Sequence, residues 1–267
     1  MNTLTPDIHR ALNVLGAEAS GAHIALAALR FTPEKSQLMA AYTSDEPRTL
    51  SRELVSRIDD VLSQAGWKLS HLDAIAVGLG PGSWTSLRIT LATCKTLAQA
   101  CEIELCGIPT FDAWAHAAWA QTAMFERREN ALVLVTARSR PDEIYGKIFA
   151  FEYSNLLSTR VIATEEARSP AAWCEVLAQI NNADCPIMVC GEARETVAQI
   201  AAERHLEIEL IDVPVADVAF QIAHLGAQKA ARGDHDDALF LQPLYIGVSN
   251  AERVWQAKQA AEKTSEI

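Results

Sequence analysis

The chain has 267 residues, a length at which one hydrophobic core tends to divide into two modest domains. Hydrophobic residues make up 49% and charged residues 21%, an ordinary globular composition that excludes a disordered or fibrous chain. Lys and Arg number 23 against 34 Asp and Glu, so the net charge of −11 gives a field that repels phosphate backbones. The charge therefore argues against autonomous binding of DNA or RNA.

No apolar run approaches the roughly 20 residues that span a bilayer. The first ten residues are too polar for a signal peptide, so we expect a cytoplasmic protein without a membrane contact. The six cysteines never fall as Cys-x-x-Cys, and the seven histidines form no pair that one helical face could present to a metal. The sequence therefore predicts no metal site and excludes a metallopeptidase.

The first part of the chain opens with three strand-like runs joined by short polar turns, which predict an antiparallel meander. Helices and short apolar strands then alternate, because apolar residues recur at helical spacing between short apolar runs. In chain order, strands are predicted at Leu12–Leu15, His23–Leu29, Ser36–Tyr42, Ala74–Val77 and Leu105–Ile108, and helices at Pro47–Leu62, Trp84–Ala100 and Ala113–Gln121.

The second part begins in the same way. Strands are predicted at Ala131–Thr136, Ile144–Tyr153, Ile187–Cys190 and Glu207–Ile211, and helices at Pro170–Ile180, Arg194–His205 and Asp217–Arg232.

Two parts with a similar order of elements suggest a duplicated unit, and antiparallel strands that continue into βαβ units make a mixed sheet with helices on its faces. This order resembles each half of the actin, Hsp70 and sugar-kinase group. The predicted fold is therefore α/β, an actin-like ATPase (ASKHA, ribonuclease H-like) fold of two similar halves with mixed sheets. We place the N-terminal half at residues 1–109, the C-terminal half at 110–255 and a flexible tail at 256–267.

A glycine-rich turn, Gly78-Leu79-Gly80-Pro81-Gly82-Ser83, joins a predicted strand to the helix that begins near Trp84. Ser83 can cap that helix, and free N–H groups at such a turn can hold an anion, which makes Gly80, Gly82 and Ser83 candidate contacts. The turn is not a Walker A loop, because no Lys follows Gly82. A tight turn for close packing of helix and strand is the alternative, and residue types alone favour it.

The turn and the residues after it, up to Arg88, resemble the G-x-G-P-G-S-[FY]-T-G-[LV]-R signature of the bacterial TsaB (also called YeaZ) family. The resemblance continues in matching order over roughly residues 12–255. Further segments that resemble the family are Arg57-Ile58-Asp59-Asp60-Val61-Leu62, Gly107-Ile108-Pro109-Thr110-Phe111, Ala137-Arg138 with Glu143-Ile144-Tyr145, Leu241-Gln242-Pro243-Leu244-Tyr245-Ile246 and Ser249-Asn250-Ala251-Glu252.

The resemblance implies the actin-like fold and a non-catalytic scaffold or activator role in making threonylcarbamoyladenosine beside the anticodon of tRNA. It implies TsaD, the threonylcarbamoyl transferase, as the partner of the first two helices, and TsaE as a further partner. It leaves open whether a nucleotide sits at the interface with TsaD, through Gly80, Gly82 and Ser83, and whether the chain forms a homodimer when alone. No other cofactor is implied.

Both hairpins that hold phosphate in actin-like ATPases have lost their usual residues. The first reads Gly16-Ala17-Glu18 where relatives commonly have Asp-Thr-[SA], so Glu18 is the only nearby carboxylate. The second reads Thr136-Ala137-Arg138, without Asp or Gly. We therefore expect no ATP hydrolysis and no catalytic residue. Leu50, Ser86 and Gly247 also depart from the family pattern.

The candidate partner-binding residues come from the two helices that the resemblance singles out. For the first helix, a single apolar stripe is more often the face packed on the chain's own sheet. In the second helix, apolar and small residues occupy more than one face, which favours a helix–helix interface. The candidates are Leu50, Leu54, Arg57, Ile58, Val61, Trp84, Leu87, Arg88 and Leu91.

The alternative hypothesis is an enzyme of the same fold, either a small-molecule kinase or a glycopeptidase. The kinase would need phosphate-loop carboxylates that Gly16 and Thr136 do not supply. The peptidase would need a metal or nucleophile constellation, and the sequence shows none.

Overall fold

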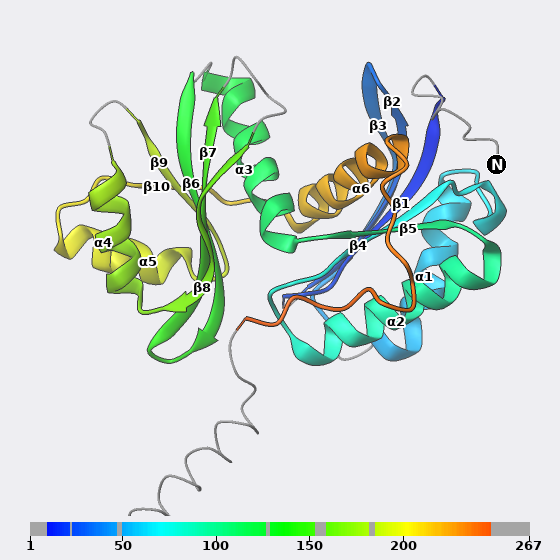
Figure 1. The fold of residues 1–267 in the computed structure, drawn as a ribbon, viewed down its shortest axis with the longest axis horizontal. Coiled ribbons are helices and arrows are strands. Elements are labelled where there is room, and N and C mark those ends of the chain that lie inside the picture. The colour runs from blue at the N-terminus through cyan, green and yellow to red at the C-terminus, as the bar shows by residue number, and fades with distance from the viewer. Residues whose placement is uncertain are drawn as a thin grey trace, which may run out of the picture.

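The computed structural model describes residues 10–21, 23–46, 50–126, 129–152, 159–181 and 185–246, with the backbone alone for residue 50 and residues 123–126. Five predictions lie wholly or partly outside these residues: the start of the first helix at Pro47, the end of the strand Ile144–Tyr153, the departure at Gly247, the segment Ser249-Asn250-Ala251-Glu252 and the tail from residue 256. The described residues form two lobes, each built on one five-stranded sheet (Figure 1).

The first sheet has the strand order β3-β2-β1-β4-β5. Its strands are β1 (Leu12–Glu18), β2 (Ile24–Thr32), β3 (Lys35–Ser44), β4 (Ala74–Gly78) and β5 (Glu104–Ile108). The helices of this part of the chain are α1 (Leu50–Gln64), the short 3₁₀ helix η2 (Leu69–His71) and α2 (Trp84–Cys101).

The second sheet has the order β10-β9-β6-β7-β8. Its strands are β6 (Asn130–Arg140), β7 (Glu143–Glu152), β8 (Arg160–Arg168), β9 (Ile187–Gly191) and β10 (Glu209–Leu210). The helices are α3 (Thr110–Glu126), α4 (Pro170–Ile180), α5 (Arg194–Glu203) and α6 (Val215–Ala231).

The two sheets repeat one topology. In each, three antiparallel strands in meander order are followed by two strands that add in parallel beside the first, β4 beside β1 and β9 beside β6. The predicted α/β fold of two similar halves with mixed sheets is therefore confirmed. The strand β8 was not predicted, because its sequence RVIATEEAR mixes charged with apolar residues and it lies at an edge of its sheet, where it is largely half-buried or exposed.

Helices cover both faces of each sheet. The helices α1 and α2 pack on the outer face of the first sheet, α4 and α5 on the outer face of the second, and α3 and α6 fill the space between the sheets (Figure 1). The central strand β1 is buried on both faces, since Leu15 and Ala17 join the core under α1 and α2, whereas Leu12 and Val14 join the core shared with α3 and α6. This explains why β1 is apolar except at Asn13 and at Glu18, its last residue.

The last helix returns to the first sheet. Although α6 follows the second lobe in the chain, it packs across β1, β2 and β4. A Cβ atom added at Gly16 would lie 2.6 Å from the backbone oxygen of Ala219, and one added at Gly226 would lie 2.3 Å from the Cβ of Ala76. The division predicted at residue 109 thus separates α6 from the sheet that it covers, and as a boundary between folding units it stays a prediction.

The contact at Gly226 can be tested with Gly226→Ala. Helix propensity alone would stabilise this variant by about 1 kcal/mol, whereas overpacking of a tight contact costs roughly 1–3 kcal/mol. Because the added methyl would meet Ala76 at 2.3 Å, we expect the overpacking to prevail and the midpoint of urea unfolding to fall. An unchanged or higher midpoint would show that α6 does not press on β4 in this way.

Candidate functional site

The cleft between the lobes is the place where an actin-like ATPase would hold phosphate. Here the ends of β1, β6 and β9, the glycine turn and the start of α3 converge on a cavity of about 20 Å³, on the order of one water molecule. Its lining residues are Glu18, Ser20, Gly21, His23, Pro81, Thr110, Phe111, Trp114, Thr136, Ala137, Glu192 and Val215. A space of this size cannot hold a nucleotide.

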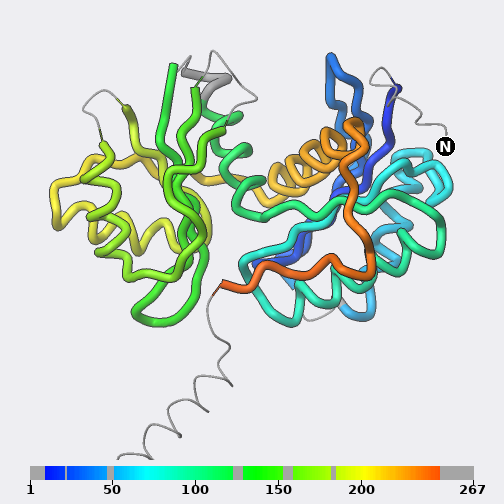
Figure 2. Tube along the Cα trace, in the orientation of Figure 1, coloured from blue at the N-terminus to red at the C-terminus, as the bar shows by residue number. Residues whose placement is uncertain are grey.

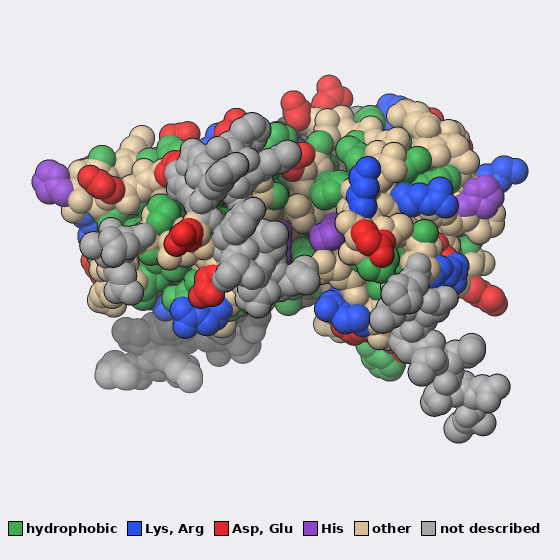
Figure 3. All heavy atoms as spheres, turned by 90° about the horizontal axis from the view of Figure 1, so that it is seen from above, with side chains coloured by type: hydrophobic (Ala, Val, Ile, Leu, Met, Phe, Trp, Pro, Cys, Tyr) green, Lys and Arg blue, Asp and Glu red, His purple; other side chains and the backbone are tan. Residues whose placement is uncertain are grey.

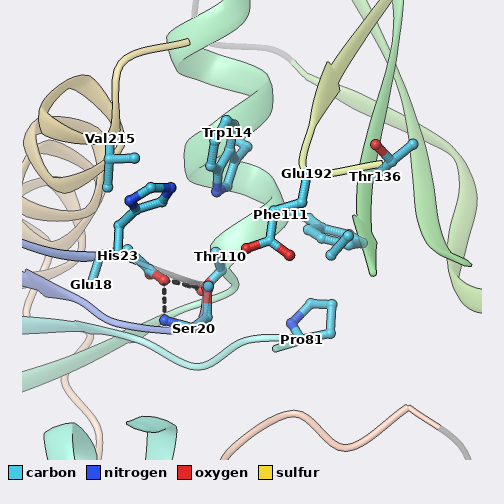
Figure 4. A pocket seen from close by; sticks show the side chains of 12 residues that line it. Glu18, Ser20, His23, Pro81, Thr110, Phe111, Trp114, Thr136, Glu192 and Val215 are labelled. Atoms are coloured by element: carbon cyan, nitrogen blue, oxygen red, sulfur yellow. Dashed lines mark hydrogen bonds between the residues drawn. The ribbon is translucent and has the colours of Figure 1, made fainter. Parts of the chain in front are cut away.

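The carboxylate of Glu18 lies at the centre of this cleft (Figure 4). It accepts hydrogen bonds from the backbone N–H of Ser20 at 2.6 Å, from the Ser20 hydroxyl, and from the hydroxyl of Thr110 at 3.0 Å. A Cβ atom at Gly78 would lie 2.0 Å from its Oε2, so Gly78 leaves the space that Glu18 fills. The residue that the sequence offered as the only substitute carboxylate therefore occupies the cleft itself.

The cleft is acidic. Glu192, which follows β9 in the opposite lobe, turns its carboxylate into the cleft, where Oε1 would lie 2.5 Å from a Cβ atom at Gly21; the lining thus holds two carboxylates and, within the described residues, neither Lys nor Arg (Figure 4). Burial raises the pKa of Glu18, the hydrogen bonds from Ser20 and Thr110 lower it in part, and the nearby charge of Glu192 raises it further. Such a lining repels the phosphates of a nucleotide.

The glycine turn is closed by hydrogen bonds within the chain. Ser83 caps α2 as predicted, since its side chain accepts from the N–H of Ser86. The N–H of Gly80 donates to the hydroxyl of Thr110 at 3.0 Å, and the N–H of Ser83 donates to the backbone oxygen of Ser20. A Cβ atom at Gly82 would lie 2.0 Å from that same oxygen. These contacts favour the tight packing turn, and the anion contact at Gly80, Gly82 and Ser83 stays a prediction.

Most of the candidate partner-binding residues lie inside the first lobe. Leu54, Ile58, Val61, Leu87 and Leu91 are buried against their own sheet, and the side chain of Leu50 lies outside the described residues. On α1 the apolar stripe therefore packs on the chain's own sheet, which was the alternative to a partner interface in the sequence analysis.

Three candidates reach the surface, namely Arg57, Trp84 and Arg88. Arg57 forms ion pairs with Glu53 at 3.0 Å and Asp60 at 3.2 Å on its own helix. The guanidinium of Arg88 lies 3.9 Å from the centre of the half-exposed Trp84 ring. A partner that binds these helices would therefore meet the exposed positions between the buried ones.

Two features of the structure have no counterpart in the sequence predictions. Tyr245 stacks on Trp84, with ring centres 4.3 Å apart; the Leu-Gln-Pro-Leu-Tyr-Ile segment was singled out, but nothing in it told where it packs. Lys147 is buried on β7 and pairs with Asp112 of α3 at 2.7 Å and Glu165 of β8 at 2.6 Å. The sequence does place a lysine within the apolar run Ile144–Phe151, and a buried lysine needs an acidic partner, which could have indicated this link between α3 and the second sheet.

The described cysteines and histidines form no ligand set. In the part of the chain that the structure describes, no group of three His, Cys, Asp or Glu side chains could hold a metal ion. Burial raises the pKa of the Cys94, Cys106 and Cys190 thiols to about 12, so these side chains pack as small apolar groups. Nor does any described helix combine the length and the hydropathy needed to cross a membrane.

Two lobes of one repeated topology, with helices on both faces of each sheet, define an α/β protein of the actin-like ATPase fold whose cleft its own side chains fill. Residues 44–263 match the family described as "TsaD: tRNA N6-adenosine threonylcarbamoyltransferase", and the chain belongs to this family.

The relatives carry the name that the motifs indicated. The chain is similar to the Escherichia coli "tRNA threonylcarbamoyladenosine biosynthesis protein TsaB", with 31% identity over 37% of this chain and 40% of the relative. It is similar to the Bacillus subtilis protein of the same name, with 22% identity over 93% of this chain and 100% of the relative. The chain thus spans less than half of the first of these relatives and the whole of the second. The resemblance to TsaB is confirmed.

Solved structures agree in fold. One described as "YeaZ from Pseudomonas aeruginosa" has a TM-score of 0.66 at 20% identity, over 88% of this chain and 100% of that one. A second, described as an uncharacterized protein "with similarity to peptidase YEAZ from Pseudomonas aeruginosa", has a TM-score of 0.68 at the same identity and coverage. At this identity the likeness shows the fold alone.

The buried carboxylate gives a prediction for stability against pH. The folded protein raises the pKa of Glu18 above its ordinary value of 4.5, so the fold favours the protonated carboxyl. The free energy of unfolding of the natural chain therefore falls as the pH rises from 4.5 through the folded pKa of Glu18. Glu18→Gln cannot ionise, so its free energy of unfolding relative to the natural chain should increase between pH 4.5 and pH 8, by about 1.4 kcal/mol for each unit of the shift.

Urea unfolding at both pH values measures this difference. Glu207→Gln serves as the control, because Glu207 is exposed on the surface and should show no such change. A difference between the natural chain and Glu18→Gln that stays constant with pH would contradict a raised pKa at Glu18.

Proposed function

We propose that this chain is a non-catalytic scaffold or activator subunit that pairs with the transferase TsaD, and with TsaE, for threonylcarbamoylation of adenosine in tRNA beside the anticodon. The observation that carries the proposal is the filled cleft, in which Glu18, Ser20 and Thr110 leave room for about one water. The printed name of the curated relatives, a tRNA threonylcarbamoyladenosine biosynthesis protein, supplies the process.

The description of the family names a transferase. The contents of the cleft favour a different role for this chain. A transferase needs a site for its substrate and groups that act on the transferred unit. In this chain the corresponding position holds a buried carboxylate that is already satisfied by three hydrogen bonds, opposite a second carboxylate. We therefore assign the chemistry to the partner and a binding role to this chain.

The surface charge also supports a binding role in which this chain does not hold the tRNA. Acidic and basic side chains of the described residues are interspersed on the face seen in Figure 3, and these residues form no continuous basic tract there. Together with the net charge of −11, this argues that the tRNA is held by another subunit. The proposal includes a cytoplasmic location, and self-association of the chain when its partner is absent.

The partner surface is proposed at α1 and α2, reached through their exposed positions. Val55 on α1 is 58% exposed and Trp84 on α2 is 46% exposed, and Arg88 and Ala92 follow on the outer side of α2. Apolar and cationic groups on two neighbouring helices suit a helix-to-helix contact with another protein.

Depletion of the protein in cells tests the process. If the chain serves this pathway, mass spectrometry should find a loss of threonylcarbamoyladenosine in bulk tRNA, and a plasmid copy of the chain should restore it. The purified chain alone should not hydrolyse Mg-ATP. Normal nucleoside levels after depletion would refute the pathway, and hydrolysis by the purified chain would favour the enzyme hypothesis.

The helices are tested by charge. The triple variant Val55→Glu, Arg88→Glu and Ala92→Glu should abolish co-purification with TsaD, because it places three carboxylates on the proposed surface while leaving the buried stripe intact. Arg160→Glu on the exposed edge of β8 is the matched control and should co-purify normally. Unchanged co-purification of the triple variant, with a normal thermal midpoint, would place the interface elsewhere.

A further inference from the structure

A segment without regular helix or strand runs from the end of α6 past β5 and then along α2 (Figure 1; Figure 2, orange). We refer to its last part, residues 237–246, as the strap. The carboxylate of Asp236, just before the strap, accepts from the N–H of Gly107 at 2.7 Å and pairs with Lys229 of α6 at 2.9 Å. The segment is therefore anchored to both β5 and α6 where the strap begins.

The strap itself is held against α2 and the glycine turn. Lys95 of α2 donates to the backbone oxygen of Leu241 at 3.0 Å, and the N–H of Leu244 donates to the backbone oxygen of Leu79 at 2.8 Å. Ala238 and Leu241 pack into the core of the first lobe. The backbone of the strap is thus held by hydrogen bonds and apolar packing at several points along its length.

Four large apolar side chains of the strap nevertheless face solvent, unlike that of Leu241. Phe240 is 76% exposed, Leu239 71%, Tyr245 44% and Leu244 36%. With Trp84 they account for five of the nine large hydrophobic side chains that the described residues leave exposed, and Tyr245 stacks directly on Trp84 of α2. Exposed apolar side chains that gather on a fixed backbone mark a protein interaction site.

Trp84, Arg88 and Tyr245 join the strap to α2. The rings of Trp84 and Tyr245 stack, the guanidinium of Arg88 lies over Trp84, and its Nε donates to the Tyr245 hydroxyl at 3.2 Å. Among the described residues no carboxylate pairs with Arg88, so its charge remains available. Trp, Tyr and Arg are the side chains that most often dominate the binding energy of protein interfaces.

We propose that the strap side chains Leu239, Phe240, Leu244 and Tyr245 form one docking surface with Trp84 and Arg88. This surface continues the α2 surface and binds the same protein partner. The partner's face is apolar and bears a carboxylate opposite Arg88. This rests on the proposed function. The unpaired cation of Arg88 selects an acidic group, and contact of the strap with α2 makes the two surfaces continuous. The partner therefore meets the C-terminal part of the chain as well as its first two helices.

The experiment measures the dissociation constant of TsaD for the full-length chain and for the double variant Leu239→Ser, Phe240→Ser. Both side chains are exposed, so folding should be kept and the thermal midpoint unchanged. We expect affinity to fall by about tenfold or more, as loss of central apolar contacts does. The matched control is Leu38→Ser with Val161→Ser, two residues of 46% and 44% exposure on β3 and β8, which should change affinity by no more than roughly twofold.

The outcomes separate this inference from the proposed function. Suppose that the natural chain binds TsaD, that Arg88→Glu weakens this binding and that the strap variant binds normally. The strap is then not part of the docking surface, and the proposed function stands. If the natural chain does not bind TsaD, the proposed function itself fails. A strap variant that changes only self-association assigns the surface to a second copy, and tenfold tighter binding after deletion of residues 247–267 assigns it to the chain's own end; either result overturns the inference.

Discussion

The close packing of α6 on the first sheet constrains the rest of the molecule. Gly16 and Gly226 give up their side chains so that helix and strands can approach, and this contact brings the last helix back to the strand that opens the fold. The same contact leaves no room at residue 16 for the carboxylate that the resemblance led us to expect there. The nearest carboxylate is Glu18, at the end of β1, and from there it turns into the cleft.

That displacement by two residues changes what the cleft can do. A carboxylate at the strand end reaches Ser20 and Thr110 of its own chain, so hydrogen bonds that could hold a ligand are made internally. The glycine turn closes from the other side and donates its N–H groups to the same elements. The polar groups at this position are therefore bonded to one another within the chain.

Much of this architecture could be predicted from the sequence, because it depends on local patterns. Ser169 and Pro170 fix the start of α4, where the prediction and the structure agree, and the repeated order of elements indicated two similar sheets. The destination of α6 could not be predicted, because an apolar stripe does not say which sheet it covers. For the same reason Leu54 and Ile58 were kept among the partner-binding candidates, although the more frequent arrangement of such a stripe, packing on its own sheet, is the one that the structure has. The strap was missed because its position depends on single hydrogen bonds between residues far apart in the chain.

The return of α6 also determines how the two lobes are joined. The chain passes from the first lobe to the second between β5 and α3, and it returns between β10 and α6. Two separate segments of the chain therefore connect the lobes. Two attachment points define an axis, and rotation about that axis is the motion that stretches neither connection. Because α3 and α6 pack on one another inside one hydrophobic core that includes residues of both sheets, such a rotation would shear that core, and a protein docked on α2 and the strap is expected to hold both lobes together.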